Sequence, residues 1–140
     1  MDTVVARHVS GDRFTVEIRE HSLHVNQPVS LGGEDSAPTP TELFVAGLVS
    51  CVAFYARRYL ARHSLPEEGL AVTGEFSIGS RPARVDTLRL QITLPQGVPA
   101  DRREPLLKVA SHCTVHNTLL EPPRVEIEFA PEHVASETGG

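Results

Sequence analysis

Residues 39–63, TPTELFVAGLVSCVAFYARRYLARH, predict the longest helix of the chain. Thr39 can act as the N-cap. Pro40 suits the first helical position, because a backbone N–H there would have no acceptor within the helix and proline has no N–H. Glu42 follows the cap by three residues, which is the spacing of a capping box in which its side chain accepts a hydrogen bond from the Thr39 amide. The Leu-Pro pair at 65–66 predicts the end of the helix.

The first half of this helix is apolar on nearly every face, through Leu43, Phe44, Val45, Ala46, Leu48, Val49, Val52 and Phe54. A helix that is apolar all round must be buried all round. A chain of 140 residues can hardly wrap such a helix alone, so we expect a second subunit to supply part of the cover. The apolar run from Leu43 to Ala56 has 14 residues, which is too short to span a bilayer.

Strands are predicted on both sides of the helix. Residues 3–30 hold three short strands, and apolar and polar side chains alternate most clearly over 14–18. Residues 70–94 hold two longer strands, which a hairpin at 80–82 joins. Hairpin-joined strands set apart from the helices are typical of α+β folds.

The last third of the chain continues this pattern. A second helix is predicted over 101–113, and a short helical piece follows through 119–120. Alternation over 125–129 predicts a last strand. The element order is therefore βββ-α-ββ-α-β, an α+β fold in a single domain over 1–130, with a flexible C-terminal tail over 131–140.

The composition is that of an ordinary globular protein, with 40% apolar residues, 22% charged residues and a formal net charge of −5. Since nucleic-acid binding needs clustered Lys and Arg, this balance argues against a nucleic-acid partner. Asp2 and Arg7 interrupt the N-terminus before an apolar signal region can form, so we expect a cytoplasmic protein that binds no membrane. In that compartment two cysteines favour metal binding or redox chemistry over a permanent structural disulfide.

The two cysteines are the candidate functional residues. Cys51 lies in the apolar helix, and Cys113 lies at the expected C-terminal end of the second helix, beside His112 and three residues before His116. Plain core packing, a redox pair, and a metal site of all four residues remain open, although only Cys113 and His116 have the local spacing of zinc ligands. We favour a redox pair with Cys51 as the attacking sulfur, because the helix dipole at a C-terminus disfavours a Cys113 thiolate.

A reactive cysteine must be a thiolate, so Cys51 in apolar surroundings needs a positive charge nearby. The candidate cations are Arg13, Arg57, Arg58 and His116. Arg57 and Arg58 lie roughly 9–10 Å along the helix axis from Cys51, which is far for direct pairing. Arg13 can be placed only by the tertiary structure.

Two stretches around the cysteines resemble the signatures of the OsmC/Ohr family of osmotically inducible proteins and organic hydroperoxide reductases. Leu-Gly-Gly at 31–33, Pro-Thr-Pro-Thr-Glu-Leu at 38–43 and then Cys51 resemble the first signature. Ala-Ser-His-Cys-Thr-Val-His-Asn-Thr-Leu at 110–119 resembles the second, which usually has proline where this chain has Thr114. The resemblance covers about residues 1–130, and it implies an OsmC-like fold in an intertwined homodimer with two active sites at the subunit interface.

The resemblance also implies the chemistry of a thiol-dependent peroxidase that needs no cofactor and no metal. By this analogy the Cys51 thiolate attacks an organic hydroperoxide, and the resulting sulfenic acid condenses with Cys113 to a disulfide. A dithiol, of lipoyl type in the best-known members, then regenerates the enzyme. Arg13 lies where the family's active-site arginine is expected, with His116 in a supporting place.

The chain departs from the family pattern at the start of the helix. Family reductases carry glutamate directly after the proline that opens the helix, whereas this chain has Thr41 there and Glu42 one residue later. Glu42 lies nine positions before Cys51, which is half a turn out of phase, so Glu42 should point away from the sulfur. The alternative function is therefore an OsmC-like protein that binds a small molecule or senses redox state, with weak or no peroxidase activity.

Overall fold

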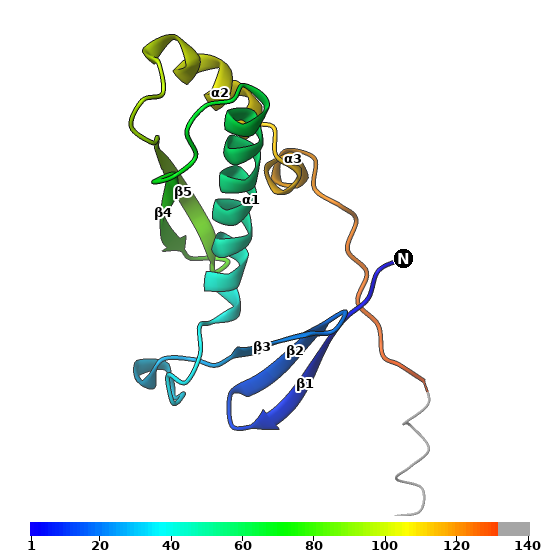
Figure 1. The fold of residues 1–140 in the computed structure, drawn as a ribbon. Coiled ribbons are helices and arrows are strands. Elements are labelled where there is room, and N and C mark those ends of the chain that lie inside the picture. Colours follow the sequence, from blue (N-terminus) through cyan, green and yellow to red (C-terminus); the bar gives the residue numbers. More distant parts are fainter. Residues whose placement is uncertain (132–140) are drawn as a thin grey trace, which may run out of the picture.

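The computed structural model describes residues 1–131 (Figure 1). Its architecture is α+β, as the sequence predicts. The elements in chain order are β1 Val4–Ser10, β2 Arg13–Ile18, β3 His21–Val25, the 3-10 turn η1 Val29–Leu31, α1 Pro40–Arg62, β4 Ala71–Gly79, β5 Arg84–Thr93, the 3-10 turn η2 Ala100–Arg102, α2 Arg103–Ala110 and α3 Thr114–Leu120. The tail predicted over 131–140 lies, after its first residue, outside the described residues.

The start of α1 is the capping box that the sequence predicts. The Glu42 amide donates to the Thr39 Oγ1 at 3.0 Å, and the Thr39 amide donates to the Glu42 Oε1 at 2.9 Å. Pro40 occupies the first helical position, and His63 is the C-cap. These local hydrogen bonds fix where α1 begins, and so they fix the place of Cys51 three turns later.

The core lies where β4, β5 and α2 pack against one face of α1 (Figure 1). Its buried members are Leu48, Val52, Ala56, Tyr59, Leu60, Leu106, Ala110 and Cys113. The antiparallel β4–β5 pair approaches α1 closely at Gly74, where a Cβ atom would lie 2.5 Å from the Val49 Cγ2. A larger residue fits this crossing of sheet and helix only if Val49 or its surroundings shift.

We expect Gly74→Ala to lower the free energy of unfolding by about 1–3 kcal/mol, because the added methyl group overpacks the crossing. Val49→Ala removes the atom that it would strike. The loss of free energy of unfolding in the double variant should therefore be about 1 kcal/mol smaller than the sum of the losses in the two single variants. Urea unfolding of the four proteins measures this coupling, and a Gly74→Ala protein more stable than the wild type would contradict the expectation.

The three-stranded sheet β1-β2-β3 stands apart from this core. Figure 1 shows it beyond the N-terminal end of α1, and within residues 1–131 it makes no extended contact with the helices. The antiparallel register collects apolar residues on one face of this sheet, namely Val4, Ala6, Phe14, Val16, Ile18, Leu23 and Val25. Val4 is 60% exposed and Leu23 43% exposed, so this face has no complete cover in the single chain.

The single chain covers α1 on one side only, whereas the sequence predicts burial all round. Val45, Leu48 and Val52 are buried, but Phe44 is 43% and Phe54 52% exposed. By length and composition alone α1 could also cross a membrane, although one of its faces is packed into the core. The apolar outer face has no partner among the described residues.

The helix predicted over 101–113 is divided, and the prediction for Cys113 is wrong. The helical stretch consists of η2 and α2 and ends at Ala110, where the Ser111 amide still donates to the Leu107 carbonyl. Cys113 has extended backbone (φ −72°, ψ 159°) and is the N-cap of α3 rather than the C-terminal end of a helix. Its Sγ accepts a hydrogen bond from the His116 amide at 3.3 Å, which gives the sequence a reason to begin a new helix here.

The strand predicted over 125–129 does not form in the single chain. Val125, Ile127 and Phe129 are 72%, 93% and 97% exposed, and residues 122–130 adopt no regular structure. A strand needs the backbone hydrogen bonds of a neighbour, and no other strand of the described chain lies beside this segment. The alternation of apolar and polar residues therefore identified a segment that is able to form a strand, but residues 1–131 supply no second strand that pairs with it.

Candidate functional site

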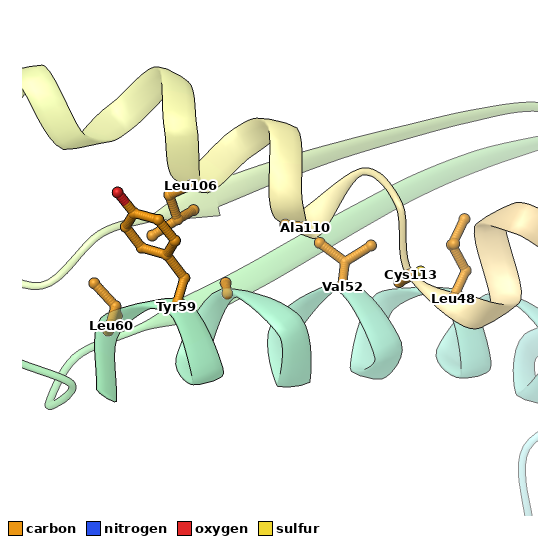
Figure 2. Close-up of a cluster of buried hydrophobic side chains, with 8 residues drawn as sticks. Leu48, Val52, Tyr59, Leu60, Leu106, Ala110 and Cys113 are labelled. Atoms are coloured by element: carbon orange, nitrogen blue, oxygen red, sulfur yellow. The ribbon is translucent and has the colours of Figure 1, made fainter. Parts of the chain in front are cut away.

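The structure brings the two cysteines together from α1 and the start of α3. Cys113 is fully buried in the core cluster, and the half-buried Cys51 packs against that cluster. Figure 2 shows Cys113 over α1, between Val52 and Leu48. Both thiols are free. The two side chains lie close to each other, since the Cys51 side chain raises the pKa of the Cys113 thiol.

The pKa of Cys113 is raised above its ordinary value, mainly because burial disfavours the thiolate. The His116 amide lowers this pKa, but by less than burial raises it. The Cys51 side chain raises the pKa further, and the Val115 amide lowers it by the smallest amount. From the sequence we expected the dipole at a helix C-terminus to disfavour the Cys113 thiolate. This cause is wrong, since Cys113 lies at the N-terminus of α3. The effect of burial is larger than the stabilisation of a thiolate by the helix N-terminus, so Cys113 is held as a protonated thiol.

This raised pKa predicts a loss of stability at alkaline pH. Burial stabilises the neutral thiol, so the contribution of Cys113 is fully present below the ordinary thiol pKa and is lost as pH rises through the raised pKa of the folded state. In that window the wild type should lose up to about 1.4 kcal/mol per pH unit relative to Cys113→Ala. Urea unfolding of both proteins under reducing conditions from pH 7 to 10 measures the difference, and parallel curves would refute it.

The candidate cations for the Cys51 thiolate differ in how close they lie to the cysteine pair. Arg57 donates to Glu67 at 2.7 Å, and the Arg58 guanidinium lies 5.4 Å from the centroid of the Phe54 ring, so both have other partners. His116 lies in α3, and its amide donates to the Cys113 sulfur while its Nδ1 lies 2.6 Å from the Ser111 carbonyl. Of the candidate cations, His116 therefore lies next to the cysteine pair.

Arg13 is not brought to Cys51 within one chain. It is the first residue of β2, in the sheet that stands apart from α1, and strand alternation places it on the face of Thr15 and Glu17. Its Nε atom is buried and has no hydrogen-bond partner among the described residues. A buried guanidinium nitrogen without an acceptor is costly, so Arg13 has the capacity to bind a further group.

Thr41 and Glu42 lie in the first turn of α1, roughly 13–15 Å along the helix axis from Cys51. The Glu42 carboxylate caps the Thr39 amide, as the sequence predicts, and both Thr41 and Glu42 are exposed. Neither residue therefore reaches the Cys51 sulfur in the single chain. The role of Glu42 here is to begin the helix that carries the cysteine.

Sequence reasoning missed Tyr55, whose phenol oxygen lies 2.9 Å from the Thr114 Oγ1. Its hydrogen bond joins α1 to the first residue of α3, immediately beside Cys113. The signal in the sequence was its position four residues after Cys51, since residues four apart lie on one helix face. The partner, 59 positions further along the chain, could not be read from any local pattern.

A cavity of about 470 Å³ lies beside the cysteine pair, between α1, β5, α2 and α3. Its wall is mainly aliphatic, with Leu48, Val52, Leu88, Leu90, Ile92, Leu94, Leu106, Leu107, Leu119 and Leu120. Arg103, Ser111 and His116 supply its polar groups, and neither cysteine lines it. Within residues 1–131 no three His, Cys, Asp or Glu side chains converge on a point, so the metal interpretation finds no ligand cluster there.

Comparison with known proteins identifies the family. A family model described as OsmC-like protein matches residues 33–128. Among curated proteins nothing matches the chain. A crystal structure of a candidate osmotic stress induced and detoxification response protein from Psychrobacter arcticus is 19% identical with a TM-score of 0.77, over 84% of this chain and 88% of that one.

Two further solved structures carry names from hydroperoxide resistance. The organic hydroperoxide resistance protein OsmC from Legionella pneumophila is 26% identical with a TM-score of 0.59, over 84% of this chain and 88% of that one. The organic hydroperoxide resistance protein from Elizabethkingia anophelis is 22% identical with a TM-score of 0.65, with the same coverage. Because the family model spans more than half of the 140 residues, this chain belongs to the OsmC-like protein family.

Proposed function

We propose that this OsmC-like protein is a thiol-dependent peroxidase that reduces organic hydroperoxides with Cys51 and Cys113 in the cytoplasm. The observation that carries the proposal is that two free thiols, 62 positions apart in sequence, lie together at the buried cluster on α1. The similarity to organic hydroperoxide resistance proteins names the substrate class. A reducing compartment suits the proposal, because the pair must return to the dithiol after each turnover.

The proposed reaction has three balanced steps. The Cys51 thiolate attacks the outer peroxide oxygen, the O–O bond breaks, and the alkoxide leaves as an alcohol after taking up a proton. The Cys113 thiol then attacks the Cys51 sulfenic acid, forming the S–S bond and releasing water. A small dithiol exchanges with this disulfide, becoming oxidised itself and returning both cysteines to thiols. Exposure supports this assignment, since Cys51 is half-buried and Cys113 is fully buried.

The proposal includes a homodimer, because both parts of the chain leave apolar surface uncovered. The outer face of α1 exposes Phe44 and Phe54, and the detached three-stranded sheet has an uncovered apolar face. In the dimer the sheet of one subunit would cover α1 of the other, which buries both surfaces. Arg13, whose Nε has no partner in the described chain, would then be the cation from the second subunit that supports the Cys51 thiolate.

The test is to treat the fully reduced protein with less than one equivalent of an organic hydroperoxide and to map its peptides under non-reducing conditions. The proposal predicts a Cys51–Cys113 linkage and one equivalent of alcohol per peroxide. Hydrogen peroxide at the same concentration serves as the comparison for substrate class. If both thiols remain reduced while the organic hydroperoxide persists, the chain is not a peroxidase.

A second candidate function, binding of an apolar small molecule, is favoured by the cavity beside the cysteine pair. Its aliphatic wall and the three polar groups at Arg103, Ser111 and His116 suit a ligand with a hydrocarbon body and a polar end. The two functions separate in a Cys51→Ser variant. This variant should lose nearly all of its reaction with peroxide, whereas unchanged affinity for an environment-sensitive fluorescent fatty acid would support a binding role.

A further inference from the structure

Tyr55 and Thr114 join the two segments that carry the cysteines. Tyr55 lies four residues after Cys51 on α1, and Thr114 directly follows Cys113 as the first residue of α3. The Tyr55 hydroxyl and the Thr114 Oγ1 share a hydrogen bond of 2.9 Å. Cys51 and Tyr55 both pack against the buried cluster that contains Cys113. The hydrogen bond therefore spans α1 and α3 at the level of the cysteine pair.

The other polar contacts around Cys113 stay within its own segment. They join the His116 ring to the Ser111 carbonyl at 2.6 Å, the Asn117 side chain to the His112 carbonyl at 3.3 Å, and the His116 amide to the Cys113 sulfur at 3.3 Å. These bonds shape the turn before α3, but none of them reaches α1. Over residues 1–131, the Tyr55–Thr114 bond is the one side-chain hydrogen bond that ties α1 to α3.

We infer that the Tyr55–Thr114 hydrogen bond positions the Cys113 thiol against Cys51 and thereby sets how readily the two sulfurs close into a disulfide. The inference rests on the proposed function, because closure is its second step. In that step the Cys113 sulfur bonds to the Cys51 sulfur, and the sulfenic hydroxyl leaves with the thiol proton as water. Holding two reacting groups in place raises their effective concentration, and Tyr55 acts only through the position of Cys113.

Tyr55→Phe and Thr114→Val each remove one hydroxyl group and keep the shape of the side chain. The readout is the equilibrium between the Cys51/Cys113 dithiol and its disulfide in mixtures of reduced and oxidised glutathione, with free thiols counted by mass spectrometry. Each variant should favour the disulfide about three- to tenfold less than the wild type, which is the effect of one hydrogen bond. The double variant should be no worse than either single one, since both remove the same bond.

Thr114→Ser keeps the hydroxyl group and should restore the wild-type equilibrium. Thr114 is exposed, so its variants test the inference even where Tyr55→Phe weakens the fold. A wild-type equilibrium in Thr114→Val, or additive losses in the double variant, would overturn the inference. So would a loss in Thr114→Ser as large as that in Thr114→Val, because the hydroxyl group would then not be the cause.

A rapid-quench experiment with organic hydroperoxide separates this inference from the proposed function. Tyr55→Phe should form the Cys51 sulfenic acid at the wild-type rate and close the disulfide about three- to tenfold more slowly. Equal slowing of both steps would contradict a positioning role for Tyr55. If wild-type Cys51 does not react with peroxide at all, the proposed function fails, whereas the glutathione equilibrium still decides the role of Tyr55.

Discussion

Replacement of Cys51 by serine is expected to lower the consumption of organic hydroperoxide by at least about 10³-fold, because it removes the attacking thiolate. Serine has nearly the same size, so the packing of the half-buried side chain against the core should persist. A ferric-xylenol orange assay measures the remaining peroxide over time. The residual rate in this variant is the uncatalysed reaction together with any reaction at Cys113.

Cys113→Ser is the matched control, because it removes the other member of the pair. The fully buried Cys113 has a raised pKa, so Cys51 should react first and this variant should still consume one equivalent of peroxide. It should then stop at a Cys51 sulfenic acid, which dimedone labels and mass spectrometry detects. Rapid turnover by Cys51→Ser, or dimedone labelling of Cys113 in that variant, would reverse the two roles.

Ile127→Asp is expected to convert a dimer into monomers. Ile127 is 93% exposed in the single chain, where a charge would cost little. If the alternating segment 125–129 pairs with the second subunit, the introduced carboxylate would carry a charge into an apolar contact, at a cost of about 3 kcal/mol or more. The dissociation constant of the dimer should then rise by at least about 100-fold. Sedimentation velocity across a dilution series measures this change against the subunit mass of 15.2 kDa.

Glu128→Asp provides the control, since it puts aspartate on the polar side of the same segment without changing the number of charges there. Its dissociation constant should stay within about threefold of the wild-type value, because surface changes have small effects. A wild-type protein that sediments at 15.2 kDa would contradict the dimer itself. Equal effects of Ile127→Asp and Glu128→Asp would instead show that the apolar side of this segment makes no contact between subunits.

Most of the local structure could be predicted because its causes lie within a few residues. The capping box of α1 and the β4–β5 hairpin both depend on contacts between near neighbours in sequence. The helix ending at Ala110 was predicted too long, because apolar spacing continues smoothly through Cys113. The break there comes from a sulfur that caps a new helix, and cysteine is not a residue from which an N-cap is expected.

The features of the candidate site also differ in whether they depend on neighbouring residues or on distant segments. The two signatures around Cys51 and Cys113 marked the candidate pair, since each signature is a continuous stretch of sequence. Tyr55 and the cavity beside α2 were not predicted, because their partners come from segments far away along the chain. Arg13 lies in a sheet that makes no extended contact with the helices among the described residues, so no local pattern could place it relative to Cys51.

The sequence by itself determined the order of the elements from β1 to β5, the capped and unusually apolar helix α1, and the cysteine that α1 carries. These follow from periodicity and short-range hydrogen bonding, which act between neighbours. Only the tertiary structure decided that Cys113 is buried against Cys51, that burial rather than a helix dipole raises its pKa, and that Tyr55 reaches Thr114. Desolvation and long-range contacts depend on what surrounds a side chain in space, and no pattern along the chain records that.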